Sequence, residues 1–169
     1  MRKNRKLREG AEYHVTARIN RGESIFESDE SKELFLDVVK RAKRKYRFQI
    51  RNFCVMGNHI HLMLKPGKNE SLSRIMQWIL GVFAMLWNRR RQVTGHLWGD
   101  RFFSRIITGV LDLLRVFLYI DNNPVDAQLI DHPWGWKYGG LWHHRMGIRD
   151  ITDKPDLIIR TFFPEHERI

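Results

Sequence analysis

Two histidines set two residues apart, His59 and His61, are the residues of this chain best suited to metal chemistry. They follow the turn-forming pair Gly57 and Asn58 and alternate with aliphatic residues. In a β-strand successive side chains point to opposite faces, so both imidazoles face one way and the aliphatic side chains the other. Two adjacent nitrogen ligands suit a divalent metal, whereas histidines with ordinary hydrogen-bond partners are commoner. The pair alone leaves both interpretations open.

A second candidate group combines a hydroxyl and an amide four residues apart, Tyr119 and Asn123. Both fall on one face of a helix that we predict over roughly residues 110–122. Pro124 should end this helix, because the residue before a proline disfavours the helical region. From the residues alone, a tyrosine packed in the core is the commonest interpretation of Tyr119. The buried stripe predicted for this helix is Leu111, Leu114 and Leu118.

Positive charge dominates the chain, with a formal net charge of +11 and a pI near 10.2. Such a balance favours an anionic partner, nucleic acid being the commonest, although a merely soluble basic protein remains the alternative. Two of the basic clusters end predicted helices, where cations also suit the helix dipole. The cations that we expect to contact nucleic acid are Arg2, Lys3, Arg5, Lys6, Arg18, Lys43, Arg44, Arg89, Arg90, Arg91 and Arg101.

The cellular compartment follows from what the sequence lacks. Cys54 is the single cysteine, which excludes an internal disulfide framework and fits a reducing compartment. The N-terminus has no apolar run of the length that a secretory signal requires. The longest apolar run, residues 78–87, is too short to span a bilayer. We therefore expect a soluble, cytoplasmic protein that does not act in a membrane.

The elements that must position these residues can be read from hydrophobic periodicity. We predict strands over residues 13–19, 48–56, 59–65 and 101–108, with helices over 29–46 and 72–88 capped by Ser28 or Asp29 and by Ser71. This order predicts an α+β fold, a ferredoxin-like βαββαβ antiparallel sheet with helices on one face, followed by an additional C-terminal helix that carries the tyrosine. We expect residues 1–169 to form a single domain, with a basic arm over 1–9 and a C-terminal extension over 145–169.

Two of these motifs together resemble a known family. Residues 56–62, with His59 and His61 at their centre, resemble the HUH signature, in which U is a hydrophobic residue. Residues 119–125 resemble the tyrosine motif of the REP-associated tyrosine transposases, which are domesticated relatives of the single-tyrosine HUH insertion-sequence transposases. Residues 13–18 and 95–102 fall in the order of the same family. Leu118 departs from its pattern, in which an arginine usually precedes the tyrosine.

The resemblance implies a metal-dependent single-stranded DNA endonuclease and strand transferase that acts at hairpin sequences. Tyr119 would be the nucleophile and would form a 5′-phosphotyrosine intermediate. His59, His61 and Asn123 would hold Mg²⁺ or Mn²⁺. No nucleotide cofactor is needed, because the covalent intermediate keeps the bond energy. The implied partner is single-stranded or hairpin DNA, bound by a monomer or a homodimer.

Two alternatives come from other functional classes. The first is a non-catalytic protein that binds structured single-stranded DNA or RNA through its basic surface. The second is a zinc hydrolase built on His59 and His61 with a water nucleophile, which lacks a general-base carboxylate near the histidines in sequence. Covalent capture of labelled DNA separates the three hypotheses, because only a tyrosine nucleophile leaves DNA on the protein.

Overall fold

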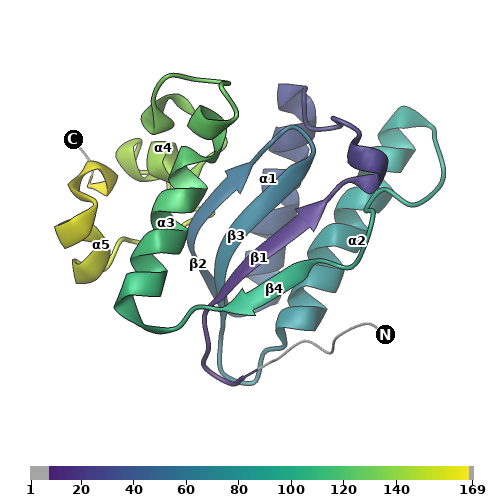
Figure 1. Ribbon diagram of the computed structural model, residues 1–169. Helices are drawn as coiled ribbons and strands as arrows, with labels where there is room; N and C mark the ends of the chain where they lie inside the picture. Colours follow the sequence, from purple (N-terminus) through teal and green to yellow (C-terminus); the bar gives the residue numbers. More distant parts are fainter. Residues whose placement is uncertain (1–7, 168–169) are drawn as a thin grey trace.

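A four-stranded antiparallel sheet with the strand order β2-β3-β1-β4 organises the computed structural model, which describes residues 8–167. The strands are β1 (Tyr13–Arg18), β2 (Phe48–Val55), β3 (His59–Pro66) and β4 (Phe103–Ile106). Helices α1 (Asp29–Lys45) and α2 (Leu72–Arg91) cover one face of the sheet, and α3 (Gly109–Asp126) lies on the other (Figure 1). The element order and the strand order are those of the predicted ferredoxin-like βαββαβ fold with an added helix.

Shorter helical segments complete the chain. The 3₁₀ turn η1 (Asn20–Gly22) follows β1, and η2 (Pro133–Gly135) follows α3. The C-terminal segment contains α4 (Gly140–Arg145), α5 (Leu157–Phe162) and η3 (Pro164–His166). These helices gather beside α3, at the left of Figure 1. No helix within residues 8–167 combines the length and the apolar character that crossing a bilayer would demand.

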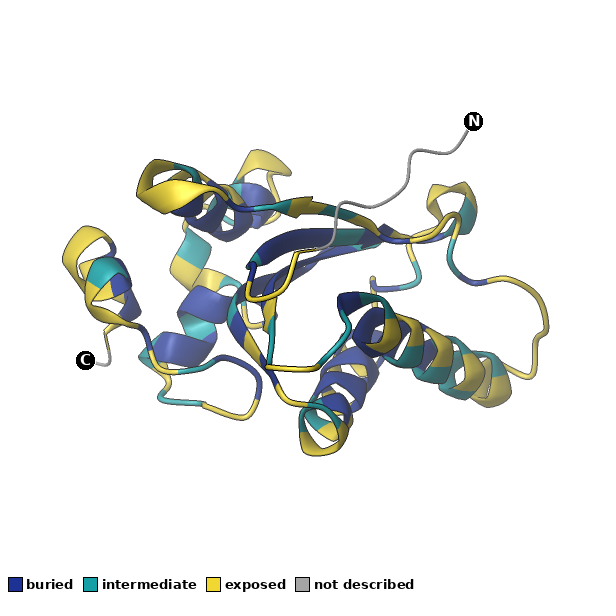
Figure 2. Cartoon of the chain, turned by 90° about the horizontal axis from the view of Figure 1, so that it is seen from below, coloured by how far each residue is buried: buried dark blue, intermediate teal, exposed yellow. Residues whose placement is uncertain are grey.

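The two long helices on the covered face begin where the capping residues predict. Ser28 accepts a hydrogen bond from the backbone N–H of Ser31 at 3.2 Å and so caps α1. Ser71 accepts from the N–H of Arg74 at 3.4 Å and caps α2. The buried faces of both helices turn towards the sheet and their exposed faces turn away (Figure 2). Local hydrogen bonding and amphipathic pattern agree at both helices, which explains why the sequence predicts them well.

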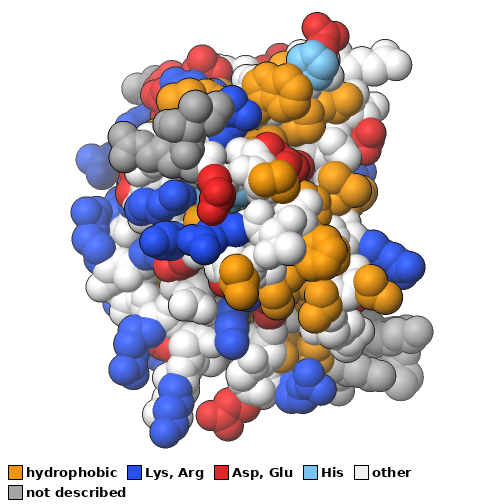
Figure 3. All heavy atoms as spheres, turned by 90° about the vertical axis from the view of Figure 1, so that its left-hand side faces the viewer, with side chains coloured by type: hydrophobic (Ala, Val, Ile, Leu, Met, Phe, Trp, Pro, Cys, Tyr) orange, Lys and Arg blue, Asp and Glu red, His pale blue; other side chains and the backbone are white. Residues whose placement is uncertain are grey.

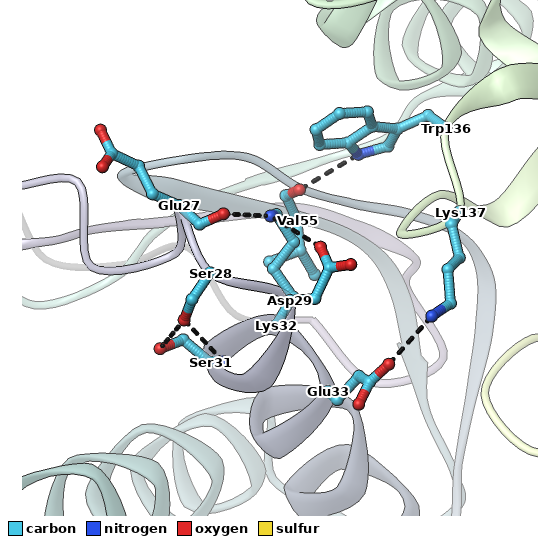
Figure 4. A network of polar contacts seen from close by, with 9 residues as sticks. All are labelled: Glu27, Ser28, Asp29, Ser31, Lys32, Glu33, Val55, Trp136 and Lys137. Atoms are coloured by element: carbon cyan, nitrogen blue, oxygen red, sulfur yellow. Dashed lines mark hydrogen bonds and ion pairs between the residues drawn. The ribbon is translucent and has the colours of Figure 1, made fainter.

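The segment after α3 returns to the sheet and to the start of α1 (Figure 4). The indole N–H of Trp136 donates to the carbonyl of Val55 at the end of β2, at 3.1 Å. Lys137 forms an ion pair with Glu33 on α1, at 2.9 Å. These contacts fix the position of the chain that leaves the C-terminal end of α3.

Each face of the sheet carries its own hydrophobic core. Ile60, Leu62 and Leu64 on β3 pack in the larger core with α1 and α2. Met63, which points the other way, packs with Phe117 on α3 in the second core. The alternation predicted for β3 is therefore observed, and His59 and His61 share the face of Met63.

Helix α3 differs from its prediction in both phase and length. Leu111 and Leu118, which the sequence pattern placed in the buried stripe, are 72% and 48% exposed. The residues that α3 does bury include Leu113, Phe117 and Ile120. Apolar residues occur all round this helix, so the pattern alone could not choose the face that packs on the sheet. The helix also continues past Pro124 to Asp126, because a proline so near the end removes only a terminal hydrogen bond.

Candidate active site

Neighbouring strands bring the two histidines of β3 and two polar residues of β1, Thr16 and Arg18, onto the face of the sheet on which α3 packs. In the antiparallel register Thr16 pairs with His61 and Arg18 with His59. The rings of His59 and His61 have centroids 4.9 Å apart and lie nearly perpendicular to each other. His61 is buried, whereas His59 is half-buried at the start of β3. The imidazole pair therefore stands side by side at one end of the sheet.

Helix α3 places Tyr119 and Asn123 in contact with the histidine pair. The phenol ring of Tyr119 meets the ring of His61 edge-on, with 5.4 Å between centroids. Tyr119 is 49% exposed, so its ring is open to an incoming ligand. Asn123, one turn further along, donates from its side chain to the carbonyl of Tyr119 at 3.0 Å and makes polar contact with His59 and His61. The structure thus brings together all four residues of the predicted catalytic and metal-binding set.

The electrostatic surroundings keep these imidazoles neutral. Burial lowers the pKa of His61 to about 3, with further lowering from His59, His14 and Arg18. Burial and the charge of Arg18 also lower the pKa of His59. The contact with Asn123 raises the pKa of both rings, but by less than burial lowers it. Neutral imidazole is the form of histidine that binds metals, so both rings are ready as ligands at neutral pH.

One buried nitrogen of this group lacks a protein partner. Among the residues that the structure describes, none makes an ordinary hydrogen bond to Nε2 of His61, although that atom is fully buried. Within the same residues no three His, Cys, Asp or Glu side chains gather as metal ligands, so no carboxylate joins the two histidines. Two imidazoles and the amide oxygen of Asn123 remain as donors, a set that fits Mg²⁺ or Mn²⁺ better than a thiolate-rich site would.

A buried chain of polar side chains holds α3 in place beneath the tyrosine. Asp121 accepts hydrogen bonds from the side-chain amide of Asn52 on β2 at 2.9 Å and from Nε2 of His166 at 2.7 Å. Nδ1 of His166 lies 2.6 Å from Nδ1 of His144 on α4. All four side chains are buried. The C-terminal extension, for which the sequence indicated no role, therefore anchors the helix that carries Tyr119.

Sequence reasoning missed two residues that contact the histidine pair, His14 and Thr16. Nε2 of His14 lies 3.0 Å from Nδ1 of His61, and the hydroxyl of Thr16 lies 3.3 Å from the same atom. The ring of His14 also meets Tyr119 edge-on, with centroids 5.8 Å apart. The signal was present, since the alternation that predicts β1 puts His14 and Thr16 on the polar side with Arg18.

The cations expected to bind nucleic acid are dispersed. Arg18 lies on the histidine face, close enough to lower the pKa of both imidazoles. Arg89, Arg90 and Arg91 end α2, and the loop after them returns to β1, where the N–H of Gly99 donates to the carbonyl of Arg18. The end of α2 that carries these arginines therefore lies at the histidine end of the sheet, at the upper right of Figure 1.

The other predicted cations that the structure describes, Arg101, Lys43 and Arg44, lie in separate places. Arg101 lines a groove of about 690 Å³ beside α2, together with Trp98 and Gln77. Lys43 donates hydrogen bonds to the carbonyl of Ile151 and the carboxylate of Asp153. It also borders a basic groove at the end of β3 opposite to His59, roughly 20 Å away as judged from the rise per residue of a strand. Arg44 is exposed near that end of α1. The arm residues Arg2, Lys3, Arg5 and Lys6 lie outside the described residues.

The side of the molecule formed by α3 and the C-terminal helices has a different character (Figure 3). Hydrophobic side chains gather across its middle and right, whereas Lys and Arg lie mostly at the left and lower margins. Exposed hydrophobic residues on α3 and α5 include Leu111, Leu118, Leu157 and Phe162. The predicted DNA-contacting cations within the described residues belong to other elements.

Comparison with known proteins agrees with this geometry. Residues 8–123 match the family model described as "Transposase IS200 like". A solved structure of a REP-associated tyrosine transposase bound to a REP hairpin superposes with a TM-score of 0.75 at 19% identity, covering 93% of each chain. A putative transposase from Deinococcus radiodurans R1 gives a TM-score of 0.48 at 17% identity, covering 72% of this chain and 97% of that one. No match was found among the curated proteins.

The two kinds of similarity carry different weight. At 19% identity the likeness to the REP-associated enzyme shows a shared fold. The family match is stronger evidence, because it spans more than half of the 169 residues and includes the strands, both histidines, Tyr119 and Asn123. The chain therefore belongs to the family of IS200-like transposases, and its role is that of a DNA-processing transposase.

Proposed function

We propose that this protein is a metal-dependent single-stranded DNA endonuclease and strand transferase that acts at hairpin sequences through a 5′-phosphotyrosine intermediate. The observation that carries the proposal is the placement of Tyr119 edge-on to His61, with Asn123 one helical turn away. One helix thereby delivers both an attacking oxygen and an amide ligand to a neutral imidazole pair. Holding the reacting groups in place in this way lowers the entropic part of the barrier.

In the first step the phenol oxygen of Tyr119 attacks the scissile phosphorus, and the bond from phosphorus to the 3′ oxygen breaks. The half-exposed ring can release its proton to solvent, while the departing 3′ oxygen takes up a proton. The products are DNA joined to Tyr119 through its 5′ phosphate and a free 3′-hydroxyl. A second 3′-hydroxyl can reverse the reaction on the same phosphorus, which transfers the strand and regenerates Tyr119 without a nucleotide cofactor.

His59, His61 and Asn123 would hold the metal, Mg²⁺ or Mn²⁺. When bound there, the ion would polarise a phosphoryl oxygen and stabilise the negative charge of the transition state. The buried Nε2 of His61 without a protein partner supports this assignment. Arg18, on the same face, would add a charge-assisted contact to the phosphate.

The proposed substrate is DNA with a hairpin next to a single-stranded segment. A protein of the same fold has been solved bound to a REP hairpin. The net charge of +11 and the arginines at the end of α2, which lies at the histidine end of the sheet, favour such an anionic ligand. We expect the protein to act in the cytoplasm as a monomer or a homodimer.

A cleavage assay on labelled hairpin oligonucleotides with single-stranded flanks tests the proposal. Cleavage should need added Mg²⁺ or Mn²⁺ and stop with EDTA, and His61→Ala should abolish it while hairpin binding largely remains. His132→Ala, which removes an exposed histidine outside the site, serves as the matched control. Full cleavage in EDTA would remove the metal from the mechanism. Hairpin binding with no cleavage under any metal would favour the non-catalytic alternative.

A further inference from the structure

The two ring nitrogens of His61 differ in their contacts with the part of the chain that the structure describes. Its Nδ1 lies 3.0 Å from Nε2 of His14 and 3.3 Å from the hydroxyl of Thr16, both on the adjacent strand β1. Its Nε2 is fully buried and has no hydrogen-bond partner among the described residues. The rings of His14 and His61 stack with an interplanar angle of 24° and 5.2 Å between centroids. Within residues 8–167, ordinary hydrogen-bond contacts to His61 are therefore made at Nδ1 and not at Nε2.

The single proton of a neutral imidazole has two possible positions on His61. On Nδ1 it is donated to His14, and the lone pair of the buried Nε2 is then free to bind a cation. On Nε2 it would be buried where no described residue offers an acceptor in ordinary hydrogen-bond geometry, the polar contact of Asn123 with the ring falling short of one, and proteins rarely tolerate such an arrangement. The contact with His14 thus selects the form of His61 that can bind a cation through Nε2.

We propose that His14 is a positioning residue for the transposase reaction, which accepts the Nδ1 proton of His61 and so fixes the tautomer and ring plane that present Nε2 as a metal ligand. Partners of this kind commonly orient metal-binding histidines. His14 is itself held, because it is only 9% exposed and packs edge-on against Tyr119. One ring thereby contacts both the proposed ligand and the proposed nucleophile. This inference rests on the proposed function.

The first test uses the unaltered, metal-free protein. Long-range proton–nitrogen NMR of protein labelled with ¹⁵N-histidine distinguishes the two tautomers of a neutral ring, and the spectrum of His61→Gln identifies the His61 signals. We expect His61 to carry its proton on Nδ1. A proton on Nε2 would overturn the proposal. Because no metal, DNA or activity is involved, this result stands even if the proposed function fails.

The second test measures Mn²⁺ affinity in variants, by the electron paramagnetic resonance signal of free Mn²⁺. His14→Leu keeps an apolar side chain in the space but removes the acceptor, and it should weaken Mn²⁺ binding by about 10- to 100-fold, the usual effect of losing such a partner. His14→Gln offers an amide oxygen as acceptor and should stay within a few-fold of the parent. Thr16→Val removes the longer contact and should change little. Far-ultraviolet circular dichroism verifies that each variant is folded.

These outcomes separate the positioning role from simple packing. Parent-like Mn²⁺ affinity in His14→Leu would overturn the proposal, and so would equal losses in His14→Leu and His14→Gln. If the parent itself binds no Mn²⁺, the proposed function fails, while the tautomer of His61 still decides whether His14 holds its Nδ1 proton.

Discussion

Replacing His166 with alanine tests how the C-terminal extension supports helix α3. His166 is fully buried, donates from Nε2 to Asp121 at 2.7 Å and contacts His144 through its other nitrogen. Its ring also packs on Phe117 of α3, with centroids 4.6 Å apart. The substitution deletes the donor and the ring together. Asn52 would continue to donate to the other oxygen of Asp121.

The expected cost can be worked from these contacts. A buried carboxylate oxygen that loses its hydrogen bond costs at least about 1–3 kcal/mol. Because the substitution also removes the ring that packs on Phe117, we expect a loss at the upper end of this range, about 3 kcal/mol, although Asn52 still donates to Asp121. For a domain of this size each kcal/mol lowers Tm by roughly 2–4 °C, so Tm should fall by about 6–12 °C.

Thermal and urea unfolding followed by circular dichroism measure this change. Arg160→Ala is the matched control, because it removes a solvent-exposed ion pair with Glu167 from the same C-terminal segment. Such surface pairs contribute at most about 1 kcal/mol. If His166→Ala lowers the free energy of unfolding no more than Arg160→Ala does, the buried polar side chains do not stabilise the position of α3, contrary to the role inferred for the C-terminal extension.

Three further predictions concern the site. Arg18→Ala should slow cleavage by about 10- to 100-fold through loss of a charged phosphate contact, measured against Arg160→Ala; equal rates would contradict that contact. Asn123→Ala should weaken Mn²⁺ binding by about tenfold and regain cleavage in excess Mn²⁺, whereas no rescue would argue against a ligand role. Burial in the folded protein lowers the pKa of His61 and of His144 to about 3, below the ordinary value of 6.5. Between these two pH values the unfolded chain therefore binds more protons than the folded protein. Stability of the metal-free protein should therefore fall as pH drops through this window, by up to ~1.4 kcal/mol per pH unit and group, and denaturation midpoints independent of pH would contradict this.

The sequence predicts those parts of the fold that local patterns determine. The alternation around His59 and His61 predicts strand β3 and the common face of the two imidazoles. Ser28 and Ser71 mark the starts of α1 and α2. The spacing of Tyr119 and Asn123 gives their common face on α3. These residues depend on neighbours within a few positions, so their arrangement could be predicted without knowledge of the tertiary structure.

Features that depend on distant contacts could not be predicted. The face that α3 buries is chosen by packing on the sheet and the C-terminal segment, which is why Leu111 and Leu118 turned out exposed. Asp121 and His166 meet across 45 positions of the chain, and no pattern near either residue signals their contact. His14 is a different case, because the alternation in β1 already placed it on the polar side of the strand.

Covalent capture of DNA tests whether Tyr119 is the nucleophile. A hairpin oligonucleotide labelled at its 3′ end is incubated with protein and Mn²⁺, and the mixture is separated on a denaturing gel. We predict a labelled protein band for the parent chain and none for Tyr119→Phe, which lacks only the hydroxyl and should bind the hairpin with nearly unchanged affinity. An adduct in Tyr119→Phe would assign the chemistry to another tyrosine, and cleavage without any adduct would show that the reaction is hydrolytic; either result contradicts the proposed mechanism.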